Sequence, residues 1–154
     1  MDSKTADATD AHYSIDAVDT LTFRLIVLGN KIASSFNADF GRKHGIILSE
    51  WRCIIWLAAR PGSSGQETSH GTAMDRMSVS RSLRSLEQKN MVKRRTDEND
   101  AKRWLWTLTP AGRAVYDAIM PHAEKRDRLI TGAFNAAELK SFSRAISKAM
   151  KALD

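Results

Sequence analysis

Residues 76–89 combine an apolar stripe with a basic stripe, and this pattern restricts the fold more than any other stretch of the chain. At 100° per residue, Val79, Leu83 and Leu86 fall within one narrow sector of a helical wheel. The opposite sector holds two arginines and an amide: Arg81, Arg84 and Gln88. The stretch therefore predicts an amphipathic helix that packs on a core and leaves arginine side chains on an exposed surface.

The positive charge of the chain is concentrated around this helix. The 154 residues include 24 Lys and Arg against 18 Asp and Glu, a net charge of +6. Residues 76–103 hold nine of the basic and four of the acidic residues, which leaves 15 basic and 14 acidic residues for the rest of the chain. A local positive field on a nearly neutral scaffold points to a polyanionic partner.

Apolar spacing of three and four residues predicts helices before residue 76. The first runs over 15–43, with glycines at 41 and 45 marking its end, and its long apolar stripe suggests a partly intersubunit role. Ser49 is the expected N-cap of the second, which ends at the Pro-Gly pair of 61–62. A short third helix over 65–71 has few apolar residues to hold it. Asp75 is the expected N-cap of the fourth helix, and Asn90 is expected to adopt a left-handed conformation after it.

A β-hairpin and two helices are expected to follow. The strands cover 92–96 and 103–108, and the alternating Trp104, Trp106 and Leu108 predict one buried face. Thr109 caps the next helix, Pro121 should kink or interrupt it, and Asn135 caps a last helix over 136–152. Short helix, turn, helix and basic hairpin is the order of a winged helix-turn-helix, so we expect a mainly α fold with a small β-hairpin wing.

The basic residues of this segment suit contacts with DNA. Arginine binds guanine O6 and N7 with two hydrogen bonds, glutamine reads adenine, and serine suits phosphates or base edges. Cations of the hairpin suit the backbone or the minor groove. The alternative is a solvated helix face and an edge strand protected by charge. The candidate DNA-binding residues are Ser80, Arg81, Arg84, Ser85, Gln88, Lys93, Arg94, Arg95, Lys102 and Arg103.

The stretch MDRMSVSRSLRSLEQKNMVKRRTDENDAKRWLWTLTPAGRAVY, residues 74–116, resembles the winged-helix core of the MarR-type (multiple antibiotic resistance regulator) transcriptional regulators. LSEWRCIIWL resembles the helix that precedes this core in the family. The resemblance implies a single domain over 15–154, with dimerisation helices at about 15–43 and 110–152 around a winged helix-turn-helix at about 48–108. Lys102 stands where the family usually has Arg, and Asn90 stands where Gly is usual.

The same resemblance implies a homodimer that binds a near-palindromic operator in double-stranded DNA. Members are often repressors that a small molecule, commonly a phenol or an aromatic carboxylate, releases from DNA. The expected ligand cleft lies between the dimerisation helices and the DNA-binding lobe. Arg24, His44 and Trp51 are candidate ligand-binding residues, although each also has an ordinary reading: core for Trp51, and surface or capping for the other two.

Other functions find less support in the sequence. No His/Cys/Asp/Glu cluster has metal-ligand spacing, and neither a phosphate loop nor a nucleophile–base pair is present, so we expect no metal, no cofactor and no enzyme activity. No apolar run is long enough to span a bilayer, residues 1–14 read as a disordered tail, and one cysteine fits a reducing cytoplasm. Two alternatives remain open at this point: an architectural DNA-coating protein and a redox sensor that uses Cys53.

Overall fold

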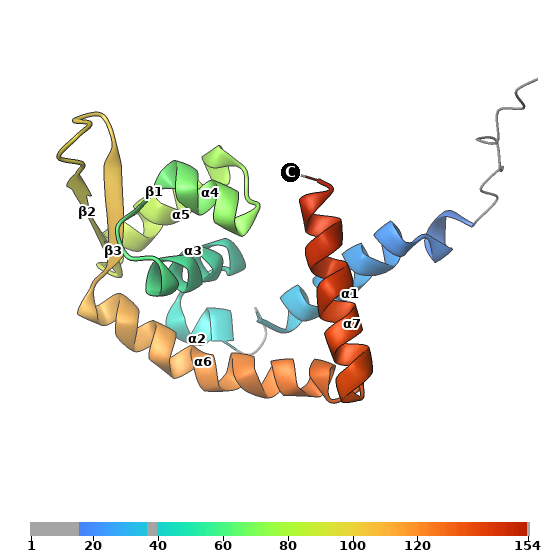
Figure 1. Cartoon of the computed structure of the whole chain (residues 1–154). Helices are drawn as coiled ribbons and strands as arrows, with labels where there is room; N and C mark the ends of the chain where they lie inside the picture. Colours follow the sequence, from blue (N-terminus) through green and yellow to red (C-terminus); the bar gives the residue numbers. More distant parts are fainter. Residues whose placement is uncertain (1–15, 37–39, 154) are drawn as a thin grey trace, which may run out of the picture.

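The computed structural model describes residues 16–36 and 40–153 and shows a helical protein with a small three-stranded sheet (Figure 1). A short 3₁₀ helix at Ala17–Asp19 precedes the numbered helices. The elements then follow in the order α1 (Leu21–Phe36), α2 (Arg42–His44), α3 (Leu48–Ala59), β1 (Ser63–Ser64), α4 (Gly65–Thr72), α5 (Arg76–Gln88), β2 (Val92–Thr96), β3 (Trp104–Leu108), α6 (Pro110–Thr131) and α7 (Ala136–Lys151). This arrangement confirms the predicted fold class. The expected tail over 1–14 lies outside the described residues.

The sheet contains a strand that the sequence did not predict. The strand order is β1-β3-β2 and both pairings are antiparallel, so β3 lies between the expected hairpin partner and the two-residue β1. Ser63 pairs with Trp106 and Ser64 with Leu105. A two-residue strand gives no periodic signal, but here it ties the start of α4 to the wing.

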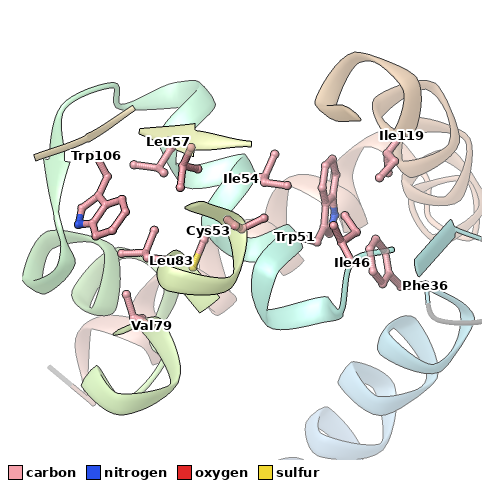
Figure 2. Packing of buried hydrophobic residues seen from close by; sticks show 12 residues of the cluster. Phe36, Ile46, Trp51, Cys53, Ile54, Leu57, Val79, Leu83, Trp106 and Ile119 are labelled. Carbon is pink, nitrogen blue, oxygen red and sulfur yellow. The ribbon is translucent and has the colours of Figure 1, made fainter. Parts of the chain in front are cut away.

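The hydrophobic core joins the helix-turn-helix, the sheet and α6 (Figure 2). Val79, Leu83 and Leu86 of α5 are each at most 1% exposed, as the helical wheel predicts. They pack in one cluster with buried residues of α3, β2, β3 and α6, namely Trp51, Cys53, Ile54, Leu57, Val92, Trp106 and Ile119. Burial of an aliphatic side chain contributes roughly 1.5–3 kcal/mol each, so this stripe fixes which face α5 turns outward.

The capping predictions hold at three helices and fail at one. Asp75, Thr109 and Asn135 each accept backbone N–H bonds at the start of α5, α6 and α7. Asn90 is left-handed, with φ 56°. Ser49, however, is not the N-cap of α3, because the helix begins at Leu48 and the carboxylate of Glu50 accepts the Ile47 N–H at 2.9 Å instead.

The single helix predicted for residues 15–43 is wrong in its bounds. Thr20 is extended, with ψ 143°, and separates the 3₁₀ turn from α1, which starts where the Thr20 hydroxyl accepts the N–H of Phe23. α1 ends at Phe36, and α2 forms separately before Gly45, whose φ of 63° ends the segment as expected. Local capping at Thr20 therefore overrides the continuous apolar spacing.

The predicted single buried face of the wing is wrong, and α6 is not interrupted at Pro121. Trp104 is 44% exposed, whereas Trp106 on the same face is 6% exposed, so the alternating residues do not form one buried face. Pro121 lies inside α6 without interrupting it. Its side chain and that of Asp117, four residues earlier, are exposed, so water can satisfy the carbonyl that loses its N–H donor.

The short helix α4 forms as predicted. It has few apolar residues, and hydrogen bonds stabilise it instead. Ser64 and Glu67 make a reciprocal capping box, and the fully buried Thr68 donates its hydroxyl to the carbonyl of Ser64 at 2.8 Å. A Cβ at Gly71 would overlap the ring of Trp56, so the absent side chain allows α4 to pack closely on α3.

Candidate nucleic-acid interface

Helix α5 presents its polar face to solvent along its whole length. The Asp75 carboxylate accepts the N–H of Ser78 at 2.8 Å and so caps the N-terminus of the helix. Arg81, Arg84 and Gln88 are exposed opposite the buried stripe. The predicted reader residues therefore lie together on one accessible helix face.

A broad groove of about 980 Å³ runs between α4, α5 and the wing. Its walls carry more cations than carboxylates: Arg76, Arg84, Arg94, Lys102 and Arg103 against Glu67 and Asp100. Figure 1 shows the β2–β3 hairpin extending beside α5, which places the wing and the helix on the same side of the molecule. A concave surface with an excess of cations concentrates polyanions.

Two of the three arginines of α5, Arg81 and Arg84, are held by hydroxyls. Arg84 donates from its guanidinium to Ser80 at 3.0 Å, and Arg81 lies 3.4 Å from the hydroxyl of Ser78. Within residues 16–36 and 40–153, neither arginine has a carboxylate at ion-pair distance. Their donors thus remain available to an external acceptor.

The cations of the wing divide into two groups. Lys93 and Lys102 form no ion pair within the described part of the chain, and Arg95 has only the exposed Glu98 at 3.6 Å. Arg94 is exposed but engaged within the protein: it pairs with Glu87 at 3.1 Å and stacks on Trp104, with 4.4 Å from its guanidinium carbon to the ring centre. This stack covers part of the ring that the core does not reach.

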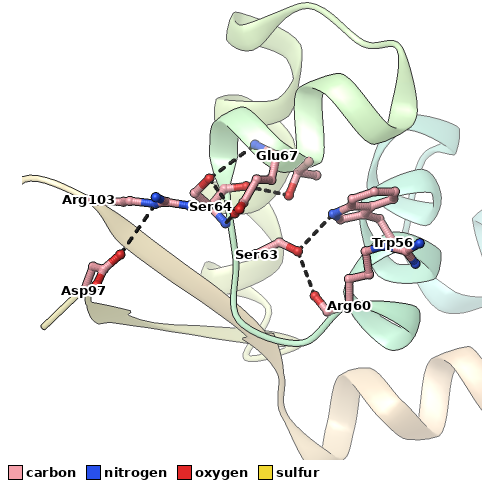
Figure 3. A network of polar contacts seen from close by, with 8 residues as sticks. Trp56, Arg60, Ser63, Ser64, Glu67, Asp97 and Arg103 are labelled. Atoms are coloured by element: carbon pink, nitrogen blue, oxygen red, sulfur yellow. Dashed lines mark hydrogen bonds and ion pairs between the residues drawn. The ribbon is translucent and has the colours of Figure 1, made fainter. Parts of the chain in front are cut away.

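Arg103 is also engaged within the protein (Figure 3). Its guanidinium lies 2.9 Å from Glu67 on α4 and 3.6 Å from Asp97 on the wing. The N–H of Ser64, the Ser64 hydroxyl and Arg103 together lower the pKa of Glu67 to about 2. The hydrogen bond and charge of Glu67 raise the pKa of Arg103 in turn. The pair is therefore ionised at any physiological pH.

A second, smaller pocket of about 270 Å³ lies between α1, α3 and α6. Trp51 forms one wall, with the Phe36 ring stacked 5.9 Å from it. Its ionisable lining residues are His122, Arg126 and Asp127 of α6. Of the three predicted ligand residues, Trp51 lines this pocket, whereas Arg24 and His44 do not.

The single thiol has the opposite properties from those of a redox sensor. Cys53 is 0% exposed, and burial, with a contribution from nearby Glu50, raises its pKa to about 12. Sensor cysteines need an accessible, stabilised thiolate.

The described residues contain no group of three or more side chains placed to hold a metal ion, and none of their helices is both apolar and long enough to cross a bilayer.

A recognition helix with an exposed basic face, a preceding short helix and a basic wing define a winged-helix DNA-binding protein. Residues 46–130 match the HxlR-like helix-turn-helix family, and the chain belongs to this family. It is a helix-turn-helix transcriptional regulator of the MarR type, as the sequence resemblance implied.

The chain is similar to known transcriptional regulators over most of its length. The Homoprotocatechuate degradative operon repressor of Escherichia coli is 23% identical over 130 residues, which cover 84% of this chain and 87% of that protein. A MarR/EmrR family transcriptional regulator from Acinetobacter sp. ADP1 superposes with a TM-score of 0.83 at 25% identity, covering 91% of this chain and 99% of the other. The MepR–DNA complex of S. aureus gives a TM-score of 0.80 at 16% identity, with 90% and 100% covered.

Sequence reasoning missed several residues of these sites. His122 and Arg126 gave no signal because polar and charged residues along a long helix resemble an ordinary exposed surface. Glu67 was not among the predicted residues, although a Ser three residues before a Glu is the sequence form of a capping box. Its partner Arg103 lies 36 positions further on, so only the folded chain reveals the pair.

Proposed function

We propose that two copies of the chain form a repressor that reads a near-palindromic operator with paired α5 helices. The groove between α4, α5 and the wing supports this proposal, because Ser80 and Arg84 of the exposed helix face and Lys102 of the wing line the same concave surface. Base edges are read by α5, and the wing follows the backbone. The proposed readers are Ser80, Arg81, Arg84, Ser85 and Gln88, and the proposed backbone contacts are Lys93, Arg95 and Lys102.

The apolar faces of the terminal helices support a homodimer. None of the residues of α7 is buried, and Leu21, Ile26 and Met150 are each more than half exposed. A single copy would leave these apolar side chains in water, and their accumulation on α1 and α7 favours association. Figure 1 shows α1 and α7 on the far side of the molecule from the wing, which leaves the groove open in a dimer formed through them.

Selection of duplexes from a random-sequence pool, followed by footprinting of the selected DNA, tests the operator proposal. We expect a discrete protected segment with two half-sites about one helical turn apart. Uniform protection of every duplex, with steep salt dependence, would instead support the architectural DNA-coating alternative.

We further propose that a small aromatic acid binds the pocket between α1, α3 and α6 and releases the DNA. Trp51 and Phe36 offer a flat apolar wall, and Arg126 and His122 offer donors for a carboxylate. The name of the E. coli relative refers to the degradation of homoprotocatechuate, an aromatic acid. Trp51 belongs to α3, which also packs on α5, so occupancy of this pocket has a direct route to the recognition helix.

A panel of benzoates, hydroxybenzoates and hydroxyphenylacetates should contain a compound that raises the unfolding temperature. At 100-fold excess over Kd, ligand binding stabilises the folded state by about 2.7 kcal/mol, or about 5 °C or more for a chain of this size. The matching amide should give no shift. Arg126→Gln should abolish the shift, whereas Arg24→Gln, outside the pocket lining, should retain it. The reverse order would assign the anion site to Arg24.

A further inference from the structure

Arg103 bridges the wing and the helix-turn-helix. Figure 3 shows its side chain between the carboxylates of Asp97, at the base of the hairpin tip, and Glu67, in the first turn of α4. The nitrogen–oxygen distances are 2.9 Å to Glu67 and 3.6 Å to Asp97. We refer to Arg103, Glu67 and Asp97 as the wing latch.

Both ends of the wing latch are held by the backbone. The second oxygen of Glu67 accepts the N–H and the hydroxyl of Ser64 at 2.7 and 2.8 Å, and Ser64 pairs with Leu105 in the sheet. At the other end, the N–H of Asp97 donates to the carbonyl of Arg103 at 2.9 Å. The guanidinium therefore joins two fixed carboxylates and sets the position of the hairpin relative to α4.

The charge balance argues against Arg103 as a phosphate contact. Its one positive charge faces two carboxylates, so the wing latch as a whole carries a net negative charge. A carboxylate in a DNA-facing groove repels phosphates, and Glu67 is half-exposed there. The ion pair between Glu67 and Arg103 offsets this repulsion, and it also holds the wing in place.

We propose that Arg103 is a positioning residue, which holds the wing against α4 through Glu67 so that Lys102 and Lys93 meet the DNA backbone. This assignment rests on the proposed DNA-facing surface. It differs from the sequence-based expectation for Arg103, in which the side chain itself enters the minor groove or contacts phosphate.

The sign of the effect of Glu67→Gln on DNA affinity provides the first test. The substitution removes a negative charge from a surface that faces a polyanion, so electrostatics alone predicts tighter binding. The glutamine oxygen still accepts the Ser64 N–H, whereas its amide group faces Arg103 and releases the wing. We expect binding of the selected duplex to weaken by about two- to fivefold, the range for an exposed ion pair.

Glu98→Gln is the matched control, because it neutralises another exposed carboxylate of the wing tip outside the latch. It should leave the affinity unchanged or improve it. The double variant Glu67→Gln/Arg103→Gln should bind no more weakly than the weaker single variant, because both remove the same interaction. Tighter binding by Glu67→Gln, equal to that of Glu98→Gln, would overturn the proposal.

The salt dependence of binding separates positioning from phosphate contact. Loss of one phosphate contact lowers the slope of log K against log salt concentration by about one. We expect this decrease for Lys102→Gln and an unchanged slope for Arg103→Gln. A decrease of about one for Arg103→Gln would make it a direct contact and refute the latch.

Hydrogen exchange of the free protein measures how firmly the wing latch holds the wing when no DNA is bound. Amides of β3 and of the hairpin tip should exchange faster in Glu67→Gln and in Arg103→Gln than in the wild type, and Glu98→Gln should match the wild type. Unchanged exchange in both latch variants would overturn the proposal. If exchange changes as expected but Lys102→Gln and Lys93→Ala bind DNA normally, the latch stands and the proposed DNA-facing surface fails.

Discussion

Replacing Lys89 with methionine should lower the free energy of unfolding by about 3 kcal/mol. Lys89 at the end of α5 binds both oxygens of Glu50, at 2.7 and 2.8 Å, and donates to the carbonyl of Gly45 at 2.7 Å. Glu50 is 2% exposed, so the substitution would leave a buried carboxylate without its cation. The lysine side chain is 33% exposed, which places the expected cost at the lower end for a buried pair broken on one side.

Urea denaturation at a fixed protein concentration measures this cost, since an associating chain has a concentration-dependent stability. Adding Glu50→Gln to Lys89→Met should recover most of the loss, because the amide oxygen still accepts the Ile47 N–H and no charge stays buried. Lys93→Met, at an exposed lysine without a carboxylate partner among the described residues, should change stability by no more than about 0.5 kcal/mol. A loss below about 1 kcal/mol for Lys89→Met would indicate that solvent reaches Glu50.

The same ion pair lies between the two proposed binding sites. Glu50 precedes Trp51, which forms a wall of the smaller pocket, and Lys89 follows the last turn of the recognition helix. A shift of α3 on ligand binding would therefore act directly on the end of α5. Thus the Glu50–Lys89 pair, which stabilises this junction, also connects the proposed effector pocket to the recognition helix.

Local patterns in the sequence were sufficient for much of the fold. The buried Val79, Leu83 and Leu86, the cap at Asp75 and the left-handed Asn90 each depend on residues within one or two helical turns. These interactions are short in sequence, so the spacing of residue types carries them. The order of elements then defined the winged helix-turn-helix without any information on distant contacts.

Interactions between distant segments could not be predicted in this way. Alternation placed Trp104 with Trp106, but Trp104 stays 44% exposed and its ring is stacked by Arg94 rather than buried in the core. Arg94 lies directly opposite Trp106 across the strands, so its stacking follows from a register that only the folded sheet fixes. The count of charges likewise does not distinguish Arg103 from Lys102. Arg103 has two carboxylate partners, whereas Lys102 has no ion pair within the described part of the chain.

Arg84→Ala should cost about 1–3 kcal/mol of affinity for the selected duplex, or roughly five- to 150-fold, and should relax the base preference at one position of each half-site. Arg84 lies in the groove on the exposed face of α5, and its bond to Ser80 holds the side chain in one direction. A pre-positioned guanidinium loses less freedom when it binds a base. Binding measurements on duplexes with single base-pair changes would locate the affected position.

Two matched variants separate base recognition from general charge. Arg84→Lys keeps the positive charge but loses the planar pair of donors, so it should behave much like Arg84→Ala in specificity while retaining the salt slope. Lys93→Ala should weaken every duplex alike and lower the salt slope by about one, because a backbone contact carries no sequence information. If Arg84→Lys bound the selected duplex as the wild type does, with unchanged base preference, Arg84 would join Lys93 as a backbone contact. The reader role would then pass to Arg81 and Gln88, the remaining long polar side chains of the exposed face.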